Sequence, residues 1–267
     1  MENLILTSIK NPLIKQVRKL QRAKERKQQN LLLIEGTNAI EAACQADYQL
    51  DTIFHTSHWQ ESHQQLWRSF ASHNWQTQLV SSEVLKAIAT TVNPDGVVAI
   101  APRSIAKPAS QVSRLGIALE RLQDPGNLGT IIRTAAATEI DGLWLSSDSV
   151  DLYNPKVLRA SAGQWFQTPM AIDQNLPEIV ERQQQQGVRI IATTAEATKT
   201  YWEVDFALPS LILLGNEGAG LSDELIQVAD EQVTIPLEKG VESLNVAIAA
   251  ALLLYEAKRQ WTLNSKL

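Results

Sequence analysis

A strand-length apolar run, a polar loop and a helical stretch follow one another three times in the second half of this chain. The runs are residues 115–119, 211–214 and 233–235, and two more strand candidates, 142–146 and 189–193, lie between the first and the second. Strands that alternate with helices predict an α/β fold whose mostly parallel sheet is covered on both faces. In such sheets the loops after the carboxyl ends of the strands form the ligand site. The three loops are therefore expected to converge.

The first hundred residues predict a second, smaller α/β domain. Asn11-Pro12 can cap and start a helix that runs to about residue 29. Short apolar runs then give four candidate strands, at residues 31–34, 52–56, 78–81 and 97–101. The Pro- and Ser-rich stretch 103–113 has no apolar periodicity and is expected to be a linker. The sequence thus predicts one domain at 1–102 and another at 114–267.

The charge of the chain is unevenly distributed. The net charge of −5 by itself argues mildly against nucleic acid as a partner. Residues 1–107 nevertheless carry a net charge of +3 and residues 108–267 a net charge of −8. Eight basic residues lie between positions 10 and 27, with Glu25 as the only acid among them. This asymmetry indicates a division of labour between the two domains.

Composition also predicts the compartment. No apolar run approaches the roughly 20 residues that span a bilayer, and the first residues lack the pattern of a signal peptide. The single cysteine, Cys44, excludes an internal disulfide, fits a reducing environment and is interpreted as a core residue. We therefore expect a cytoplasmic protein that does not bind a membrane.

The second and third loops could form a slot for a flat ligand. Gly215, Gly218 and Gly220 let the backbone approach a ligand closely, since they carry no Cβ and tolerate positive φ. Neither the Gly-x-Gly-x-x-Gly nor the Gly-x-x-x-x-Gly-Lys pattern of nucleotide sites is present. Glycines that only cap turns, and a serine that only caps a helix, would explain any one loop as well. Apolar and hydrogen-bonding side chains of these loops together suit an adenosine-like ligand: Pro236, Leu237, Leu244, Asn216, Ser243 and Asn245.

Metal binding is not expected. All four histidines lie in the first half of the chain, and a zinc site built from them would want cysteines or well-placed carboxylates. They are interpreted as surface residues among the tryptophans 59, 67 and 75: His55, His58, His63 and His73.

Three ordered motifs of this chain resemble those of the SpoU (TrmH-type) RNA methyltransferases. They are the run from Asn127 to Arg133 (NLGTIIR), the run from Leu214 to Leu221 (LGNEGAGL), and Ile235-Pro236 followed by Ser243-Leu244-Asn245-Val246. Residues 150–163 resemble the segment that this family carries between its first two motifs. The N-terminal part resembles the family's substrate-binding domain, which is similar to a group of small RNA-binding ribosomal proteins.

The third motif departs from the family pattern at one place. The family usually has Ile-Pro-Met and a glycine two residues later, whereas this chain has Leu237 and Lys239, with the glycine displaced to Gly240. The shape of the cofactor loop is therefore open at this point.

The resemblance implies a SPOUT-class fold, in which the C-terminal part of the sheet is threaded through a loop as a trefoil knot. It also implies that two copies form a homodimer. The apolar stretch 244–257 fits a helix that is buried against its own core and a partner, but a fully internal helix would look the same, so the homodimer rests on the resemblance. The implied cofactor is S-adenosylmethionine. Its expected binding residues are Thr193, Leu214, Gly215, Asn216, Gly220, Ile235, Pro236, Leu237 and Leu244.

The family transfers a methyl group to a ribose 2′-hydroxyl, so the resemblance implies an RNA (ribose-2′-O-)-methyltransferase that acts on rRNA or tRNA. Arg133 is the residue that the family assigns to activating the hydroxyl. Because arginine stays protonated in proteins, we expect it to bind the substrate phosphate or to stabilise the developing alkoxide. The proton would leave to Glu217, water or the cofactor carboxylate. Asn127 is expected to cap its helix and orient Arg133 or the ribose, and Ser243 and Asn245 complete the candidate catalytic set.

RNA binding is expected from basic side chains on or beside the first predicted helix, several of which recur at a spacing of four. A charged helix is often only a solvated face, but here it accompanies an acidic domain that should repel RNA. Two further basic residues follow the first motif and would contact phosphate near the active site. The candidate RNA-binding set is Lys10, Lys15, Arg18, Lys19, Arg22, Arg26, Lys27, Lys156 and Arg159.

Two alternatives to this function stay open. Related SPOUT enzymes methylate a base nitrogen, and alkaline hydrolysis of the product would separate the two reactions. A catalytically inactive RNA-binding or assembly module is the other alternative, although the intact motif residues argue against it. The sequence does not identify the RNA or the nucleotide.

Overall fold

A computed structural model describes residues 5–70, 73, 75–173 and 175–264 of the chain. The chain divides into two compact units. The first contains the residues up to Ala106 together with Asp151–Phe166, and the second contains Lys107–Val150 and the residues from Gln167 onward.

The second unit is built on a parallel sheet. Its strands pair in the order β7-β6-β5-β10-β8-β11-β9, and every pairing is parallel. Strands β5, β6 and β10 are almost wholly apolar and buried along their length, because a parallel sheet is covered on both faces. Their bounds are β5 Leu115–Leu119, β6 Gly142–Ser146, β7 Met170–Asp173, β8 Arg189–Thr193, β9 Lys199–Thr200, β10 Ser210–Leu214 and β11 Glu231–Thr234.

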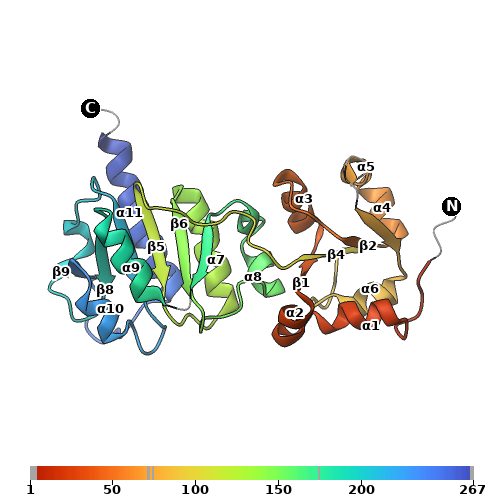
Figure 1. Cartoon of the computed structure of the whole chain (residues 1–267), viewed down its shortest axis with the longest axis horizontal. Coiled ribbons are helices and arrows are strands. Elements are labelled where there is room, and N and C mark those ends of the chain that lie inside the picture. The colour runs from red at the N-terminus through yellow and green to blue at the C-terminus, as the bar shows by residue number, and fades with distance from the viewer. Residues whose placement is uncertain (1–4, 71–72, 74, 174, 265–267) are drawn as a thin grey trace. The chain divides into compact units, whose positions relative to one another are not determined.

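Helices cover both faces of this sheet (Figure 1). Helices α9 (Leu176–Gln185) and α10 (Asp223–Gln227) share one core cluster with Trp144 and Leu213. Helices α7 (Pro125–Thr138) and α11 (Val246–Asn264) pack against each other, and α11 also contacts β10. A short 3₁₀ helix, η3, spans Tyr201–Glu203. The predicted α/β fold class is confirmed, whereas the threading of a knot stays a prediction.

The first unit has a smaller, mixed sheet. Its strands pair in the order β1-β4-β2-β3, with only β2 and β3 parallel. Helices α1 and α6 share a core cluster with this sheet that includes Val17, Phe54 and Ile88. The bounds are β1 Leu31–Glu35, β2 Thr52–His55, β3 Gln76–Leu79 and β4 Val97–Pro102. The helices are α1 Pro12–Lys19, α2 Ala23–Gln29, α3 Thr37–Gln45, α4 Ser57–Ser62, α5 Gln64–Ser69, α6 Ser82–Ile88 and α8 Pro155–Ala160, with η2 at Gln164–Phe166.

The prediction of a single long helix at the start of the chain is wrong, because two helices, α1 and α2, occupy this stretch. The chain turns between α1 and α2, and Gln21 in this turn donates its side-chain amide to the carbonyls of residues 87–89 at the end of α6. Arg26 reaches back from α2 and donates to the carbonyls of Leu20 and Gln21 at 2.9 and 3.1 Å. The side chain of Arg26 thus satisfies the carbonyls of Leu20 and Gln21, which an uninterrupted helix would have bonded itself.

Residues 151–166 belong to the first unit, although the sequence analysis assigned them to the second domain. Asp151 accepts hydrogen bonds from Arg26 at 2.6 and 3.0 Å, and Arg103 lies over the ring of Tyr153 at 4.0 Å. Trp165 packs edge-on against Tyr48. A contiguous domain boundary could not be read from composition because these partners lie between 50 and 125 residues apart in the sequence.

The predicted linker is packed rather than free. Val112 is buried, and its N–H donates to Oε1 of Gln183 at 3.0 Å. The N–H of Ala109 donates to the carbonyl of Met170 at 2.9 Å.

Within the described residues, no helix is both long and apolar enough to cross a membrane.

Candidate active site

A cavity of about 500 Å³ opens where three strands of the larger sheet end. Its walls come from the loops after β8, β10 and β11 and from the first turns of α11. In the sheet β8 lies between β10 and β11, so the carboxyl ends of these strands meet at one edge, as in other open α/β sheets that bind ligands there.

Most of the predicted cofactor residues line this one cavity. Pro236 is the exception, since it is not among the lining residues. The loops after β10 and β11 therefore converge as the sequence predicted, and their role towards a cofactor stays a prediction. The predicted residues in the lining are Thr193, Leu214, Gly215, Asn216, Gly220, Ile235, Leu237 and Leu244.

The loop after β10 folds back on itself and requires glycine at its first position. The N–H of Asn216 donates to the carbonyl of Gly220 at 3.0 Å, and the N–H of Gly220 donates back to the carbonyl of Asn216 at 2.9 Å. A Cβ on Gly215 would lie 2.1 Å from the backbone carbon of Gly220. Gly220 itself has φ +68°, which L side chains rarely adopt. The side-chain oxygen of Asn216 accepts from the N–H groups of Gly218 and Ala219.

Two threonine hydroxyls of the cavity have no partner. The Oγ1 atoms of Thr193 and Thr194 are buried, and neither forms a hydrogen bond within the described residues. Buried polar atoms are normally hydrogen-bonded. The cavity therefore offers two hydroxyls to a polar ligand, beside apolar walls that include Leu214 and Leu244.

The first motif lies at the start of α7, and its cap differs from the prediction. The side chain of Asp124 accepts from the N–H of Asn127 at 2.9 Å and caps the helix. Asn127 was expected to be the cap. An Asp-Pro pair at this position is a strong helix start, so the capping residue could have been read from the sequence.

Asn127 instead joins the three motifs. Its side-chain amide donates to Oε1 of Glu217 at 3.1 Å, and its Oδ1 accepts from the side-chain amide of Asn245 at 2.9 Å. Asn245 also caps α11, because its Oδ1 accepts from the N–H of Ala247 at 2.9 Å. Three of the five predicted catalytic residues thus form one hydrogen-bonded chain, which we call the Asn–Asn–Glu chain. A fourth, Ser243, lines the cavity with Glu217.

Arg133 is exposed. It lies further along α7, and its guanidinium forms no hydrogen bond or ion pair with the described part of the chain. A cation without an internal partner is available to an anionic substrate group. Its catalytic role stays a prediction.

Residues of the third motif line the cavity, although the motif departs from the family pattern at Leu237 and Lys239. Leu237 and Val241 line the cavity, and Gly240 has φ +96° in the exposed loop between β11 and α11. Lys239 is exposed and does not line the cavity. The displaced glycine thus supplies a left-handed turn in this loop.

Most of the predicted RNA-binding residues are solvent-exposed. Those of the first unit's surface are Lys10, Lys15, Arg18, Lys19, Arg22, Lys27 and Lys156. Arg26 has to be removed from the set, because its side chain is only 2% exposed and forms an ion pair with Asp151. Arg159 is 29% exposed and donates to the buried carboxylate of Glu35 at 2.9 Å and to the hydroxyl of Thr90.

His55 is not a surface residue. It is fully buried, and its ring packs at a tilt of 53° against Trp67 with 4.5 Å between the ring centroids. Burial disfavours the charged imidazole and lowers the pKa of His55, although its contact with the carbonyl of Thr56 acts the other way. Among the described residues, no group of three or more His, Cys, Asp or Glu side chains is placed to hold a metal ion.

Glu120 does not line the cavity but supports its surroundings, and it was not singled out from the sequence. It follows the apolar strand β5, its side chain is 13% exposed, and it accepts from the N–H of Ser222 at 2.7 Å. This bond ties the end of β5 to the start of α10 behind the Gly215 loop. A carboxylate directly after a wholly apolar strand was the available signal.

Family models match both units of the chain. Residues 114–255 match the SpoU rRNA Methylase family, and residues 11–99 match the MRM3-like substrate binding domain.

Individual relatives align with almost the whole chain. An uncharacterized tRNA/rRNA methyltransferase of Synechocystis is 47% identical over 96% of this chain and 93% of its own length. The 23S rRNA (guanosine(2553)-2′-O)-methyltransferase of Bacillus subtilis is 32% identical over 95% of this chain and 98% of its own. The crystal structure of an AdoMet-bound rRNA methyltransferase from Sinorhizobium meliloti superposes with a TM-score of 0.84, at 30% identity over 96% of this chain and 97% of that chain.

Proposed function

This chain belongs to the SpoU rRNA methylase family, and from that premise we propose that it transfers a methyl group from S-adenosylmethionine to a ribose 2′-hydroxyl of 23S rRNA. The observation that carries the proposal is the single cavity formed by the loops after β8, β10 and β11, with the Asn–Asn–Glu chain joining it to α7. The resemblance found in the sequence and the relatives agree on this class of enzyme.

The residues of the cavity fit S-adenosylmethionine. Its volume and apolar walls suit a nucleoside, and a pocket of this kind fixes its ligand with a few polar groups. The unpartnered hydroxyls of Thr193 and Thr194 and the backbone of the Gly215 loop would provide these groups. When bound, S-adenosylmethionine supplies a methyl group on a positively charged sulfur, from which an oxygen nucleophile can take it.

The chain's own residues would prepare the ribose hydroxyl. Arg133 keeps its charge and stabilises the oxygen as its negative charge develops. Glu217 is exposed at the mouth of the cavity and is held by the amide of Asn127. In this proposal the O–H bond breaks as the new O–CH₃ bond forms, and Glu217 accepts the proton.

The choice of 23S rRNA rests on relatives that align over both units. The Bacillus subtilis relative is named for 23S rRNA and covers 95% of this chain, and the Sinorhizobium meliloti structure is named for rRNA and covers 96%. The substrate-binding unit is therefore part of what this chain shares with rRNA enzymes. The exposed basic residues of α1 and α2 would hold the RNA backbone through phosphate contacts.

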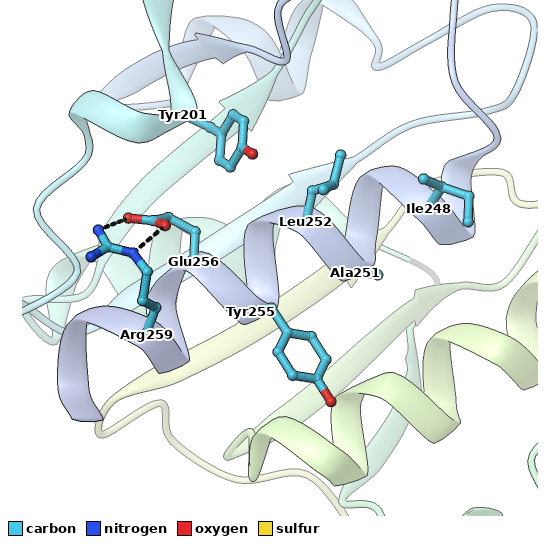
Figure 2. A pocket seen from close by; sticks show the side chains of 7 residues that line it. All are labelled: Tyr201, Ile248, Ala251, Leu252, Tyr255, Glu256 and Arg259. Carbon is cyan, nitrogen blue, oxygen red and sulfur yellow. Dashed lines mark hydrogen bonds and ion pairs between the residues drawn. The ribbon is translucent and has the colours of Figure 1, made fainter. Parts of the chain in front are cut away.

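We also propose that two copies dimerise through α11. Ile248 and Tyr255 are 51% and 53% exposed on this helix, and with Leu252 they lie along one groove of about 410 Å³ (Figure 2). At one end of the groove Glu256 and Arg259 form an ion pair at 2.6 Å. A second copy would present the same groove, as a two-fold interface requires.

Sedimentation of two variants tests the dimer. Ile248→Asp and Tyr255→Asp place a charge in the groove and should yield monomers. Val92→Asp is the matched control, since Val92 is an 88% exposed apolar residue of the first unit. A wild-type chain that sediments as a monomer at micromolar concentration would refute the dimer.

Two further properties follow from the proposed function. The protein would work in the cytoplasm, in line with its single cysteine. Its C-terminal segment would be threaded as a trefoil knot, which the fold class of the family supports.

The function is tested by mapping ribose methylation in 23S rRNA from cells that lack the protein. One 2′-O-methyl group should disappear and return when the gene is restored. Purified protein and labelled S-adenosylmethionine should place label in alkali-resistant dinucleotides, because a 2′-O-methyl group blocks cleavage there. Label in mononucleotides would instead indicate base methylation, and binding of RNA without label transfer would indicate a non-catalytic module.

A further inference from the structure

Four residues, Glu120–Gln123, separate β5 from Asp124, the cap of α7, and the last three of them, Arg121–Gln123, form a turn. Two serines hold the backbone of this turn, one at the end of β6 and one in the loop that follows it. Ser146 Oγ accepts from the N–H of Arg121 at 2.8 Å, and Ser149 Oγ accepts from the N–H of Leu122 at 3.0 Å. The N–H of Val150 donates to the carbonyl of Leu122 at 2.7 Å.

The hydroxyl protons of these serines can be assigned. Ser146 Oγ donates to Oδ1 of Asp148 at 2.6 Å and lies 2.9 Å from Ser149 Oγ. A hydroxyl has one donor and two acceptor sites. Because Ser146 already donates to Asp148, Ser149 must donate to Ser146. Hydrogen bonds thus run in one direction from the backbone of the turn to a carboxylate. We call Ser146, Asp148 and Ser149 the serine clasp.

The clasp holds a backbone that would not adopt its shape alone. Arg121 has φ +53°, in the left-handed region that non-glycine residues rarely occupy. From the other side, its carbonyl accepts from the side-chain amide of Asn216, in the loop after β10, at 2.9 Å. The turn is therefore fixed between the β6 loop and the Gly215 loop.

Catalytic geometry depends on this turn because the first motif follows it directly. Asp124 caps α7 immediately after the turn. Asn127, which donates to Glu217, lies in the first turn of this helix. If the turn relaxed, the start of α7 would move relative to the cavity. Displacements of about 1 Å can lower an enzymatic rate about a hundredfold.

We propose that Ser146 and Ser149 are positioning residues for methyl transfer, which fix the Arg121 turn and thereby the start of α7 against the cofactor cavity. In this proposal they act through the turn and not by contact with substrate or cofactor. The proposal rests on the proposed function. The clasp does not line the cavity, so its loss should affect the rate of transfer and not the affinity for S-adenosylmethionine.

The test compares Ser149→Ala with Ser147→Ala in the full chain. Ser147 lies in the same loop and is exposed, and its hydroxyl has no hydrogen bond within the described residues. Ser149→Ala should lower kcat at least tenfold, with the dissociation constants for S-adenosylmethionine and 23S rRNA within threefold of wild type. Ser149→Thr, which keeps the hydroxyl, should restore kcat to within threefold, and Ser147→Ala should leave it unchanged.

Hydrogen exchange gives a readout without turnover. The amides of Arg121 and Leu122 should exchange faster in Ser149→Ala and at the wild-type rate in Ser147→Ala. If the wild-type chain methylates rRNA but Ser149→Ala keeps its kcat within threefold, the clasp has no positioning role. An equal loss of kcat and of cofactor affinity would also overturn the proposal, as a general structural defect. A wild-type chain that binds cofactor and RNA without methylating would instead refute the proposed function.

Discussion

Asn245 donates its side-chain amide to Oδ1 of Asn127 at 2.9 Å, across 118 residues of sequence. Asn127 in turn donates its side-chain amide to Glu217. The first motif is therefore hydrogen-bonded to both the second and the third through this one asparagine. Three motifs that are far apart in the chain are thereby one hydrogen-bonded site.

The substitution Asn245→Asp should remove the hydrogen bond to Asn127 while keeping the cap of α11. Aspartate can still accept from the N–H of Ala247, so α11 stays capped, but it cannot donate to Asn127. We expect kcat to fall as far as in Asn127→Ala, with a melting temperature close to wild type. Asn245→Ala should in addition lose about 1 kcal/mol of stability with the cap. Because the two asparagines share one bond, the double variant Asn127→Ala/Asn245→Asp should be no slower than either single variant. If the reductions in kcat of the two single variants were additive in the double variant, the Asn–Asn–Glu chain would be contradicted.

Gly215→Ala should abolish cofactor binding while Gly218→Ala should not. The methyl group at position 215 would overlap the backbone of Gly220, whereas at position 218 it would meet only Oδ1 of Asn216 at 3.7 Å. Calorimetric titration with S-adenosylmethionine should show at least a tenfold loss for the first variant and less than threefold for the second, in keeping with overpacking of a closed loop. Equal affinities would show that the Gly215 loop does not form the cofactor site.

The basic residues of α1 and α2 should divide into two classes. Replacing Lys15, Arg18, Lys19 and Arg22 by alanine should weaken RNA binding and flatten its salt dependence by about 0.7–0.9 per lost phosphate contact. Arg26→Ala should instead lower the free energy of unfolding by about 3 kcal/mol, because it leaves the largely buried Asp151 without its main partner. Filter binding at several salt concentrations and urea unfolding separate the classes. Loss of RNA affinity in a stably folded Arg26→Ala protein would contradict this division.

Glu35 should make the first unit sensitive to acid. Burial is the largest single influence and raises the pKa of Glu35, but hydrogen bonds from Thr90 and Thr91 together outweigh it, so that its pKa lies below the ordinary 4.5. The stability that this carboxylate contributes is complete above pH 4.5 and is lost as the pH falls through its folded-state pKa.

Unfolding curves between pH 3 and 7 measure this effect. In Glu35→Gln the free energy of unfolding should fall less steeply below pH 4.5 than in the wild type. The exposed control Glu61→Gln should keep the wild-type pH dependence. At neutral pH, Arg159→Ala should cost about 2 kcal/mol, the range for hydrogen bonds to charged groups. If Glu35→Gln kept the full acid sensitivity of wild type, the carboxylate would not be its source.

Much of the catalytic unit could be predicted from the sequence. Strands β5, β6 and β8 have the predicted bounds, since continuous apolar runs between polar turns define buried parallel strands. The family, the fold class, the activity and the cofactor inferred from the three motifs agree with the comparisons. The convergence of the loops after β10 and β11 was expected because loops at the carboxyl ends of parallel strands lie at one edge of the sheet.

Other features depend on long-range partners that periodicity does not show. The break after Lys19 goes with the bonds from Gln21 to the distant carbonyls of residues 87–89 and from Arg26 to the nearby carbonyls of Leu20 and Gln21. Arg26 looked like one more surface cation because its partner, Asp151, lies 125 residues away. Strand β7 and helix α9 were not predicted, and the turn held by Ser146 and Ser149 carries no motif.

The rate of methyl transfer by Arg133→Lys tests the central claim most directly. Lysine keeps the positive charge but lacks the planar fork of arginine. Single-turnover transfer from labelled S-adenosylmethionine to 23S rRNA should be at least tenfold slower in Arg133→Lys, and slower still in Arg133→Ala, with unchanged cofactor affinity. A lysine variant that retains most of the wild-type rate would contradict the role of this guanidinium at the reacting ribose.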